Sequence, residues 1–513
     1  MKSSLFKKTI ALLLAVSIAT CVAGCGSEDE GDDSGTLSNS DKIATNTNKN
    51  GTIEMPYDTE STFNPATCTN LYNLAVADLM FECLFDLDDD LNPVPLLCES
   101  YTTEDGIKYT FTIRSDVKFS DGSAFTAEDA VYSITQAKSS TNYVRRFSCI
   151  KGISATSSTT FDVTLHYANY SFPSLLNIKV MKNGTASAKA PTGTGPYYLS
   201  GDTLLPNSHY RDESKTFTDS IRLVDITTID FTEAFENGDI DIVSIDPAEK
   251  IFKYVNIDYD TYYYNSTVLQ YISFNFNSSI TSNAALRTAI SLCIDRDYIA
   301  SSIRDGSIHA SPIILNSQLC GYYDTAWEKG RGYNLEKAKE LLEEAKIKDY
   351  NGDGLLEYPS GDSYRSFSLE FIVNKESPYK VAAAEYITES LRSLGFDIKL
   401  NILSWSEYLL ALTNGDFDMY YAEVGIGTDY NFAPLLETDG TLNYGDLILT
   451  VYSNLVYDFL AAPDRESKLE AAEDLCKTIA DNSPIIPIGY KTYAVMTHRN
   501  QIENLSPSIS SIF

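Results

Sequence analysis

The chain has 513 residues, in which 39 Lys and Arg stand against 71 Asp and Glu, so the formal net charge is −32. This length predicts two or three lobes with large buried cores. The acidic balance excludes a nucleic-acid surface, which needs a basic stripe, and it disfavours direct adsorption to an anionic membrane. With 43% hydrophobic and 21% charged residues, the composition is typical of a folded globular protein.

The N-terminal segment has the pattern of an export signal. Three lysines precede the apolar run 10–18, and the sequence VAGC closes it at residues 22–25. This closing sequence resembles the lipobox of bacterial lipoproteins, in which the cysteine is acylated after cleavage. We therefore expect a lipoprotein signal peptide over 1–24, a lipid on Cys25 and a flexible polar tether over 25–49. The alternative is an ordinary signal peptide that is cleaved nearby.

The spacing of the remaining cysteines predicts no metal site. None of them forms a CxxC pair or a zinc spacing, so we expect no structural zinc. An export signal permits disulfides, but their pairing cannot be deduced from spacing. Cys293 falls on the apolar face of a predicted helix, which favours a buried, unreactive thiol.

Apolar periodicity predicts both strands and helices after the tether. Residues 109–114 alternate between apolar and polar side chains, as in a half-buried strand. Thr126 then opens a helix, with Asp129 three residues later as its capping-box partner.

The later part of the chain repeats this alternation of elements. One helix is predicted from Leu335, and another over 380–394, where Gly395 ends it. Residues 396–402 alternate as a strand. Helices that alternate with strands indicate α/β lobes.

Motifs of enzymes are missing from the sequence. It contains no GxSxG, HExxH, GxxxxGK[ST] or GxGxxG motif. Ser377 and Lys380 fit an SxxK pattern, but neither SDN nor KTG accompanies it, so we attribute the match to chance. We therefore expect a protein without catalysis of its own.

One segment matches the first half of a calcium loop. Asp349, Asn351 and Asp353 supply oxygen donors at the first, third and fifth places, and a glycine follows at the sixth. Ser360 stands at the twelfth place, where a bidentate glutamate is needed, and Glu357 could replace it only with a different geometry. A polar turn is therefore favoured over a weak calcium site.

Residues 109–134 carry a specific resemblance to a known family. Their sequence, YTFTIRSDVKFSDGSAFTAEDAVYSI, closely resembles the signature of family 5 extracellular solute-binding proteins, which are the oligopeptide, dipeptide and nickel receptors of ABC importers. Weaker matches keep the family's order, so that the resemblance covers about residues 50 to 490. They lie at 81–86, Pro95, 99–101, 193–197, 235–241, 286–290, 294–296, 351–354, 415–418 and 483–487.

The resemblance implies an α/β fold of two lobes that close on a ligand like a hinged clamp, with an extra domain inserted in the first lobe. The hinge is expected near Phe274 and Asn275 and over 483–487. The implied boundaries are 42–67, 190–273 and 480–513 for the first lobe, 68–189 for the inserted domain and 274–479 for the second lobe.

The resemblance also implies a ligand site. The peptide-binding members hold the α-ammonium of the peptide with an aspartate, and the matching residue is Asp429, with Tyr430 and Asn431 beside it. Alternatively, Asp429 only begins or caps a helix. Ile426 stands where the family has an aromatic residue, and we expect this difference to reshape the cleft.

Other parts of the ligand site are less well defined by the resemblance. No basic residue matches the family's anchor for a ligand carboxylate, although Lys375 and Lys380 are close in sequence, which favours a longer peptide or a non-peptide ligand over a dipeptide. By its position, Asn64 is expected to line the wall of the first lobe. Trp405 is a candidate for stacking on a ligand ring.

These observations together predict a lipid-anchored, monomeric receptor on the extracellular face of the cell membrane, or on the periplasmic side where an outer membrane is present. It would bind oligopeptides and deliver them to an ABC permease with separate ATPase subunits, and it would need no cofactor and no nucleic acid. An oligosaccharide or a nickel chelate stays open as the ligand. The alternatives from other classes are a surface hydrolase and a sensory or adhesive protein.

Overall fold

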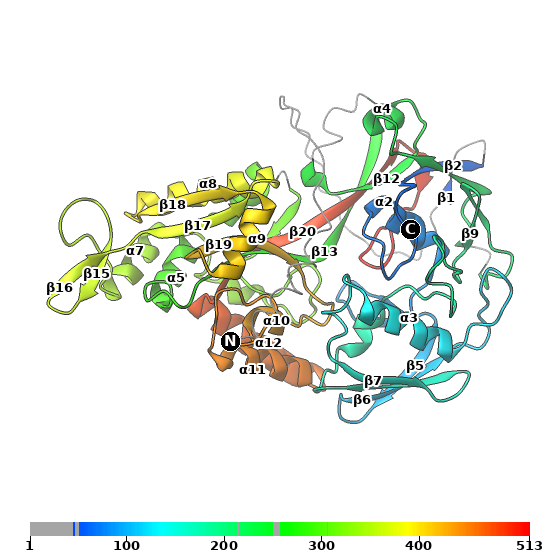
Figure 1. Ribbon diagram of the computed structural model, residues 1–513, viewed down its shortest axis with the longest axis horizontal. Helices are drawn as coiled ribbons and strands as arrows, with labels where there is room; N and C mark the ends of the chain where they lie inside the picture. The colour runs from blue at the N-terminus through cyan, green and yellow to red at the C-terminus, as the bar shows by residue number, and fades with distance from the viewer. Residues whose placement is uncertain (1–44, 47–50, 213–214, 250–256, 305) are drawn as a thin grey trace.

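The computed structural model describes residues 45–46, 51–212, 215–249, 257–304 and 306–513, and it contains three main sheets (Figure 1). The predicted signal peptide, Cys25 and the predicted tether, apart from residues 45–46, lie outside the described residues. Across the described part of the chain, no helix combines the length and the apolar character that crossing a membrane requires.

A four-stranded sheet forms the first lobe. Because β2 and β11 pair in parallel, residues near 52 and near 220 become neighbours. Helix α2 (Leu71–Met80) buries its apolar residues against this sheet, and its N-cap Asn70 accepts two backbone N–H groups of the first turn. The strand order is β2 (Thr52–Tyr57), β11 (Ser220–Asp225), β10 (Thr203–Pro206) and β9 (Tyr197–Ser200).

A second four-stranded sheet belongs to the inserted domain. The predicted strand 109–114 is confirmed as β6, whose alternate residues face a core in which the rings of Phe111 and Phe161 stack at 5.0 Å. Helix α3 (Ala127–Ser139) packs against this sheet and begins after Thr126, as predicted. The strand order is β5 (Cys98–Thr103), β6 (Lys108–Ile113), β8 (Thr160–Leu165) and β7 (Ile150–Ala155).

The second lobe is a sheet with helices on both faces (Figure 1). Alternate residues of its strands enter opposite cores, as Ile372 and Phe371 do. Its strands besides the crossing pair are β19 (Met419–Gly425), β17 (Leu369–Asn374) and β18 (Ile398–Leu403). One face carries α5 (Ala284–Leu292), α7 (Leu335–Glu344) and α8 (Pro378–Ser393). The other carries α9 (Trp405–Asn414), α11 (Thr450–Ala461) and α12 (Arg465–Asn482).

Two long antiparallel strands, β13 (Tyr259–Phe274) and β20 (Ile485–His498), run from one lobe into the other (Figure 1). In the first lobe β12 (Ile242–Ile245) pairs with β20, and in the second lobe β19 pairs with β13. The register between the long strands shifts between Asn265 and Leu269 and again between Gln270 and Tyr271, and the pairing continues to Ser273 and Ile485. The first shift therefore lies closer to the first lobe than the expected hinge at Phe274 and 483–487, whereas the second shift adjoins the expected hinge at Pro487.

The described cysteines are unpaired and buried, and Cys293, at the end of α5, is fully buried as predicted. The other predicted elements are also confirmed. Helix α7 begins at Leu335, helix α8 begins two residues before the predicted start, and Gly395 follows it with a φ of 89°.

Candidate functional site

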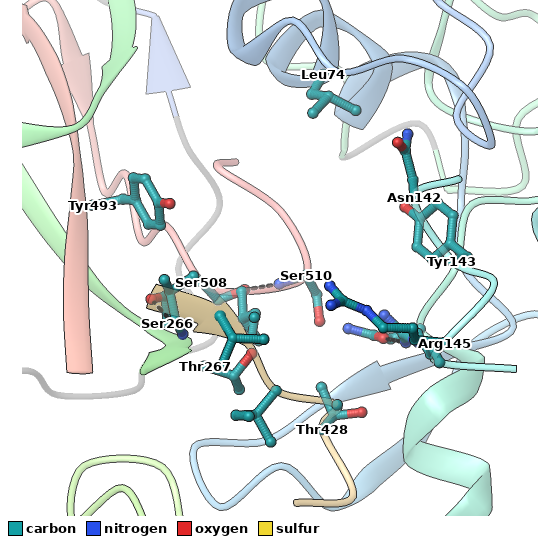
Figure 2. A pocket seen from close by; sticks show the side chains of 18 of the residues that line it. Leu74, Asn142, Tyr143, Arg145, Ser266, Thr267, Thr428, Tyr493, Ser508 and Ser510 are labelled. Carbon is teal, nitrogen blue, oxygen red and sulfur yellow. Dashed lines mark hydrogen bonds between the residues drawn. The ribbon is translucent and has the colours of Figure 1, made fainter. Parts of the chain in front are cut away.

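A cavity of about 520 Å³ lies where the two lobes and the inserted domain meet (Figure 2). The second lobe contributes the end of β19 and the loop after it, and the bulged part of β13 forms the floor at Ser266, Thr267 and Val268. Six further segments line the cavity. They are residues 65–78 around α2, residues 142–146, residues 177–179, Ser244 of β12, Tyr264 with Tyr493, and residues 508–512.

The loop after β19 is shaped by its own polar contacts. The Asp429 carboxylate accepts the Asn431 backbone N–H at 3.2 Å, and Tyr430 adopts a left-handed φ of 56°. A Cβ at Gly427 would lie 2.5 Å from the Asp429 carboxylate oxygen, so this position needs glycine. The turn therefore holds Asp429 against the cavity wall. Asp429 does not cap the following helix α10 (Ala433–Leu436), whose N-cap is Phe432.

Asp429 is buried and is held from the inserted domain. The side-chain amide of Asn169 donates a hydrogen bond to its carboxylate at 2.8 Å. Burial raises the pKa of Asp429, and this effect is opposed by the Asn169 and Asn431 hydrogen bonds and by the charges of Lys468 and Arg146. A buried carboxylate of this kind favours a cationic partner.

Two neighbouring arginines of the inserted domain line the same cavity, and they differ in whether their guanidinium groups have partners among the described residues. Arg146 donates to the Leu175 carbonyl at 2.9 Å and to the Asn177 side chain, so its guanidinium is occupied. The Arg145 guanidinium has no hydrogen bond or ion pair with any described residue, and burial lowers its pKa. Arg145 was not predicted from the sequence, and it is the type of group that binds a carboxylate in bidentate fashion.

The remaining lining combines apolar and aromatic walls with polar groups, among them the ion pair of Asp78 and Lys179. Leu74, Val424 and Ile426 form apolar walls, and the rings of Tyr264 and Tyr493 stack at 5.9 Å on the first-lobe side. An apolar cavity with a few convergent polar groups is the usual form of a small-molecule site.

The predicted site residues are brought together only in part. Asp429 and Asn431 line the cavity, together with Ile426. Tyr430 is buried in the core of the second lobe, and Trp405 stacks on Tyr408 at 5.9 Å, so neither lines the cavity. Asn64 also lies outside the lining, because its side chain binds the backbone at Ala66 and Ala186.

The two lysines near the expected carboxylate anchor do not enter the lining. Lys380 forms an ion pair of 2.9 Å with Glu423, and Lys375 is exposed. Glu423 also lies 3.9 Å from Lys491, which pairs with Asp246 at 2.5 Å. These charges link β19, β20 and the segment after β12 beside the cavity.

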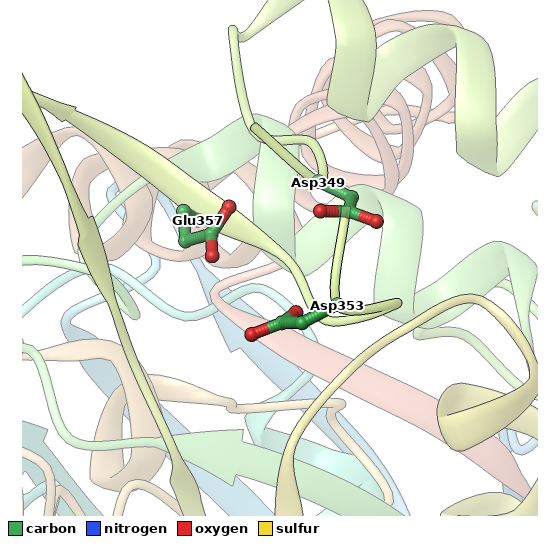
Figure 3. A group of neighbouring side chains, drawn as sticks. All are labelled: Asp349, Asp353 and Glu357. Atoms are coloured by element: carbon green, nitrogen blue, oxygen red, sulfur yellow. The ribbon is translucent and has the colours of Figure 1, made fainter. Parts of the chain in front are cut away.

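The candidate calcium loop is a polar turn on the second lobe (Figure 3). Asp349, Asp353 and Glu357 bring carboxylate oxygens within 4.8 Å of one another, and Glu357 is buried. Asp349 accepts the backbone N–H groups of Gly352 and Gly354, and Glu357 accepts that of Tyr350, so the turn uses these oxygens internally. These hydrogen bonds are those of a polar turn, which stays the favoured prediction for the loop.

A cavity between two α/β lobes that are joined by crossing strands defines the class of solute-binding proteins. The sequence model of the bacterial extracellular solute-binding proteins, family 5, matches residues 92–443, and the chain belongs to this family. The predictions of the fold class and of a protein that binds a solute without catalysis are thereby confirmed.

Characterised relatives of the chain differ in their named ligands. The oligopeptide-binding protein AppA of Bacillus subtilis is 24% identical, over 98% of this chain and 95% of its own length. The nickel-binding periplasmic protein of Escherichia coli is 25% identical, over 82% of this chain and 85% of its own length. The crystal structure of a putative peptide-binding protein AppA from Clostridium difficile has a TM-score of 0.72 at 19% identity, and it covers 90% of this chain and 98% of the other.

Proposed function

We propose that this protein is the receptor of an ABC importer and that it captures short peptides with free ends. One observation carries the proposal: the cavity contains both a buried carboxylate, Asp429, and a guanidinium, that of Arg145, which has no ion pair with any described residue. A peptide has an α-ammonium at one end and a carboxylate at the other, so this pair of groups matches its charges. The tyrosines and the small polar residues between them tolerate varied side chains.

The size of the cavity supports a compact ligand. Sites of roughly 300 to 1,000 Å³ accommodate ligands of drug size. A volume of about 520 Å³ therefore suits a peptide of a few residues. The names of the relatives include oligopeptides, nickel and glutathione, and the charges of the site support a ligand with a free ammonium and a carboxylate, as peptides have. A buried carboxylate disfavours an anionic metal chelate, because like charges repel in a desolvated site.

We also propose the cellular setting. Cys25 carries a lipid anchor on the extracellular or periplasmic face of the membrane, and the monomeric receptor delivers its ligand to a permease with separate ATPase subunits. The lobes follow the boundaries given above, except that α2 packs with the first lobe and not with the inserted domain. They close about the irregular part of β13 and β20. The proposed ligand is held between them and reaches the permease in a closed receptor.

Thermal melting with a defined ligand panel tests this function. Free di- to pentapeptides should raise the melting temperature in proportion to the logarithm of their concentration, because they bind only the folded state. The same measurement is made separately with a complex of nickel and histidine, with glutathione and with a trisaccharide. A rise with one of these compounds and none with the peptides would overturn the peptide assignment but keep the receptor.

A further inference from the structure

A segment close to the C-terminal end of the sequence enters the cavity. We call residues 508–512 the cleft segment; all five of them line the cavity (Figure 2). The segment is held in a tight turn, in which the Ser508 hydroxyl accepts the backbone N–H groups of Ser510 and Ser511 at 3.2 and 3.3 Å. Figure 2 shows it crossing the view between Tyr493 and Arg145.

One end of the cleft segment is fixed to the first lobe. The backbone N–H of Ile512 donates to the Asp78 carboxylate at 2.9 Å, and the Ile512 side chain is buried in the core of that lobe. Lys179 of the inserted domain forms an ion pair of 2.7 Å with Asp78 and donates to the Ser510 carbonyl at 3.2 Å. The following residue, Phe513, stacks on Phe217 with ring centroids 5.1 Å apart.

The other side of the cleft segment touches the second lobe. The side chain of Ile509 packs against the core cluster that includes Leu435, Tyr444 and Val456. The segment therefore contacts the first lobe through Ile512, the inserted domain through Lys179, and the second lobe through Ile509. A segment that is fixed on several sides resists displacement by a ligand.

We propose that the cleft segment is a built-in wall that limits the length of the bound ligand and contributes Ser510 to its recognition. The hydroxyl oxygen of Ser510 is buried and has no hydrogen-bond partner among the described residues, although the residue lines the cavity. A buried hydroxyl is costly without a partner, so a polar ligand group has a ready partner here. The inference rests on the proposed function for the identity of the ligand and goes beyond it in assigning a determinant of ligand length.

A substitution of Ser510 tests the wall by isothermal titration calorimetry with free di- to hexapeptides. Ser510→Trp should weaken the longest peptide that the original protein binds by about tenfold to a hundredfold, because this peptide reaches the wall and overpacking a filled site is costly. The shortest peptide does not reach Ser510, so its affinity should change by less than about threefold. Ser506→Trp is the matched control, because Ser506 is exposed and outside the lining, and it should leave every affinity unchanged.

Two further measurements separate this proposal from the identity of the ligand. Native mass spectrometry of co-purified molecules should give a smaller ligand mass for Ser510→Trp than for Ser506→Trp, whatever the class of ligand. Hydrogen exchange of residues 508–512 should slow when a bound peptide covers them. The proposed wall would be contradicted if a folded Ser510→Trp protein lost affinity equally for peptides of every length. It would also be contradicted if the two variants carried ligands of equal mass, or if residues 508–512 exchanged faster when a peptide is bound. If no peptide binds but the co-purified ligand is smaller in Ser510→Trp, the peptide assignment is wrong and the wall is retained.

Discussion

At the scale of single residues, Asp429 gives the sharpest test of peptide binding. Asp429→Asn keeps the shape of the side chain and removes its charge. Because an α-ammonium taken into a closed cavity needs a charged partner, this change should weaken a free-amine peptide by about 2 to 5 kcal/mol. Calorimetry with the same peptide acetylated at its N-terminus should give weak binding to the original protein and a much smaller loss on mutation.

The acetylated peptide also controls for damage to the fold. Asp429 supports its own turn and accepts a hydrogen bond from Asn169, so the substitution could act through structure alone. A structural effect would weaken both peptides to the same extent. Equal losses for the two peptides would remove Asp429 from direct contact with the ligand.

The charge cluster beside the cavity predicts a stability that depends on pH. Burial alone would raise the pKa of Glu423, but the charges of Lys380 and Lys491 outweigh it and hold the pKa at about 2. The ordinary value of 4.5 applies to the unfolded chain, so the stabilisation is fully present above pH 4.5 and is lost as the pH falls toward 2. It amounts to about 3 kcal/mol at neutral pH.

Denaturant unfolding between pH 2 and 7 measures this contribution. Glu423→Gln should lower the free energy of unfolding at neutral pH and flatten its dependence on pH below 4.5. Glu385→Gln on the exposed face of α8 is the matched control and should follow the original protein. If the free energy of unfolding depends on pH in the same way in Glu423→Gln and in the original protein, Glu423 is not the source of the pH dependence.

At the scale of elements, the start of α3 tests whether a local sequence signal stabilises the inserted domain. The backbone N–H and the hydroxyl of Thr126 both donate to the Asp129 carboxylate, at 2.9 and 2.7 Å. Thr126→Ala should lower the free energy of unfolding by about 1 kcal/mol. Thr135→Ala, at an exposed position of the same helix, should change it by less than about 0.5 kcal/mol. An equal effect of the two substitutions in denaturant unfolding would argue against the cap.

Local patterns predicted these elements because their causes are local. The apolar alternation of β6, the cap of α3 and the glycine after α8 each act within a few residues, and all three appear in the structure. The position of the strand irregularity at Asn265 to Leu269 depends on the pairing of distant strands, and no local signal encodes it.

The cavity could be predicted only where a family pattern identified it. Asp429 and Asn431 were found because a short motif carries them, whereas Arg145 and the cleft segment reach the cavity only through tertiary packing. Trp405 was chosen for its chemistry, but its ring packs on Tyr408, because the direction of a side chain depends on the neighbouring elements. Sequence spacing does not report that direction.

At the scale of the whole molecule, the proposed lipid anchor determines where the receptor resides. A diacylglycerol with an added acyl chain provides enough buried methylene groups to hold an acidic protein at a membrane. Cys25→Ser should therefore release the protein into the medium of cells that lack an outer membrane, as cell fractionation measures. Cys293→Ser serves as the control and should stay with the membrane fraction. Unchanged retention of Cys25→Ser would contradict the anchor.

Closure of the lobes is the second property that only the whole molecule can show. Besides β13 and β20, contacts of the inserted domain with the second lobe join the two sides. The Asn169 amide meets Asp429, the Thr428 hydroxyl donates to the Ser174 carbonyl at 2.9 Å, and Lys468 donates to the Ser171 hydroxyl at 3.0 Å. The Asn431 amide also donates to the Tyr167 hydroxyl at 2.9 Å, and Leu87 and Leu91 pack into the core of the second lobe. A ligand in the cavity adds contacts across the same interface, so we expect binding to shift the population of the receptor toward the closed form.

Small-angle X-ray scattering with and without a bound peptide measures this shift. The radius of gyration should fall when the peptide that raises the melting temperature is added, because the ligand contributes contacts to both lobes at once. The N-acetylated peptide at the same concentration should leave it unchanged. Asn169→Ala removes a contact across the lobes, so the ligand-free radius should increase. Because Asn169 also binds Asp429 in the cavity lining, the radius and not the affinity is the readout of closure for this variant. If the radius is the same in all four samples, the lobes do not move on binding, and recognition by the permease would have to depend on the ligand-filled surface instead of on closure.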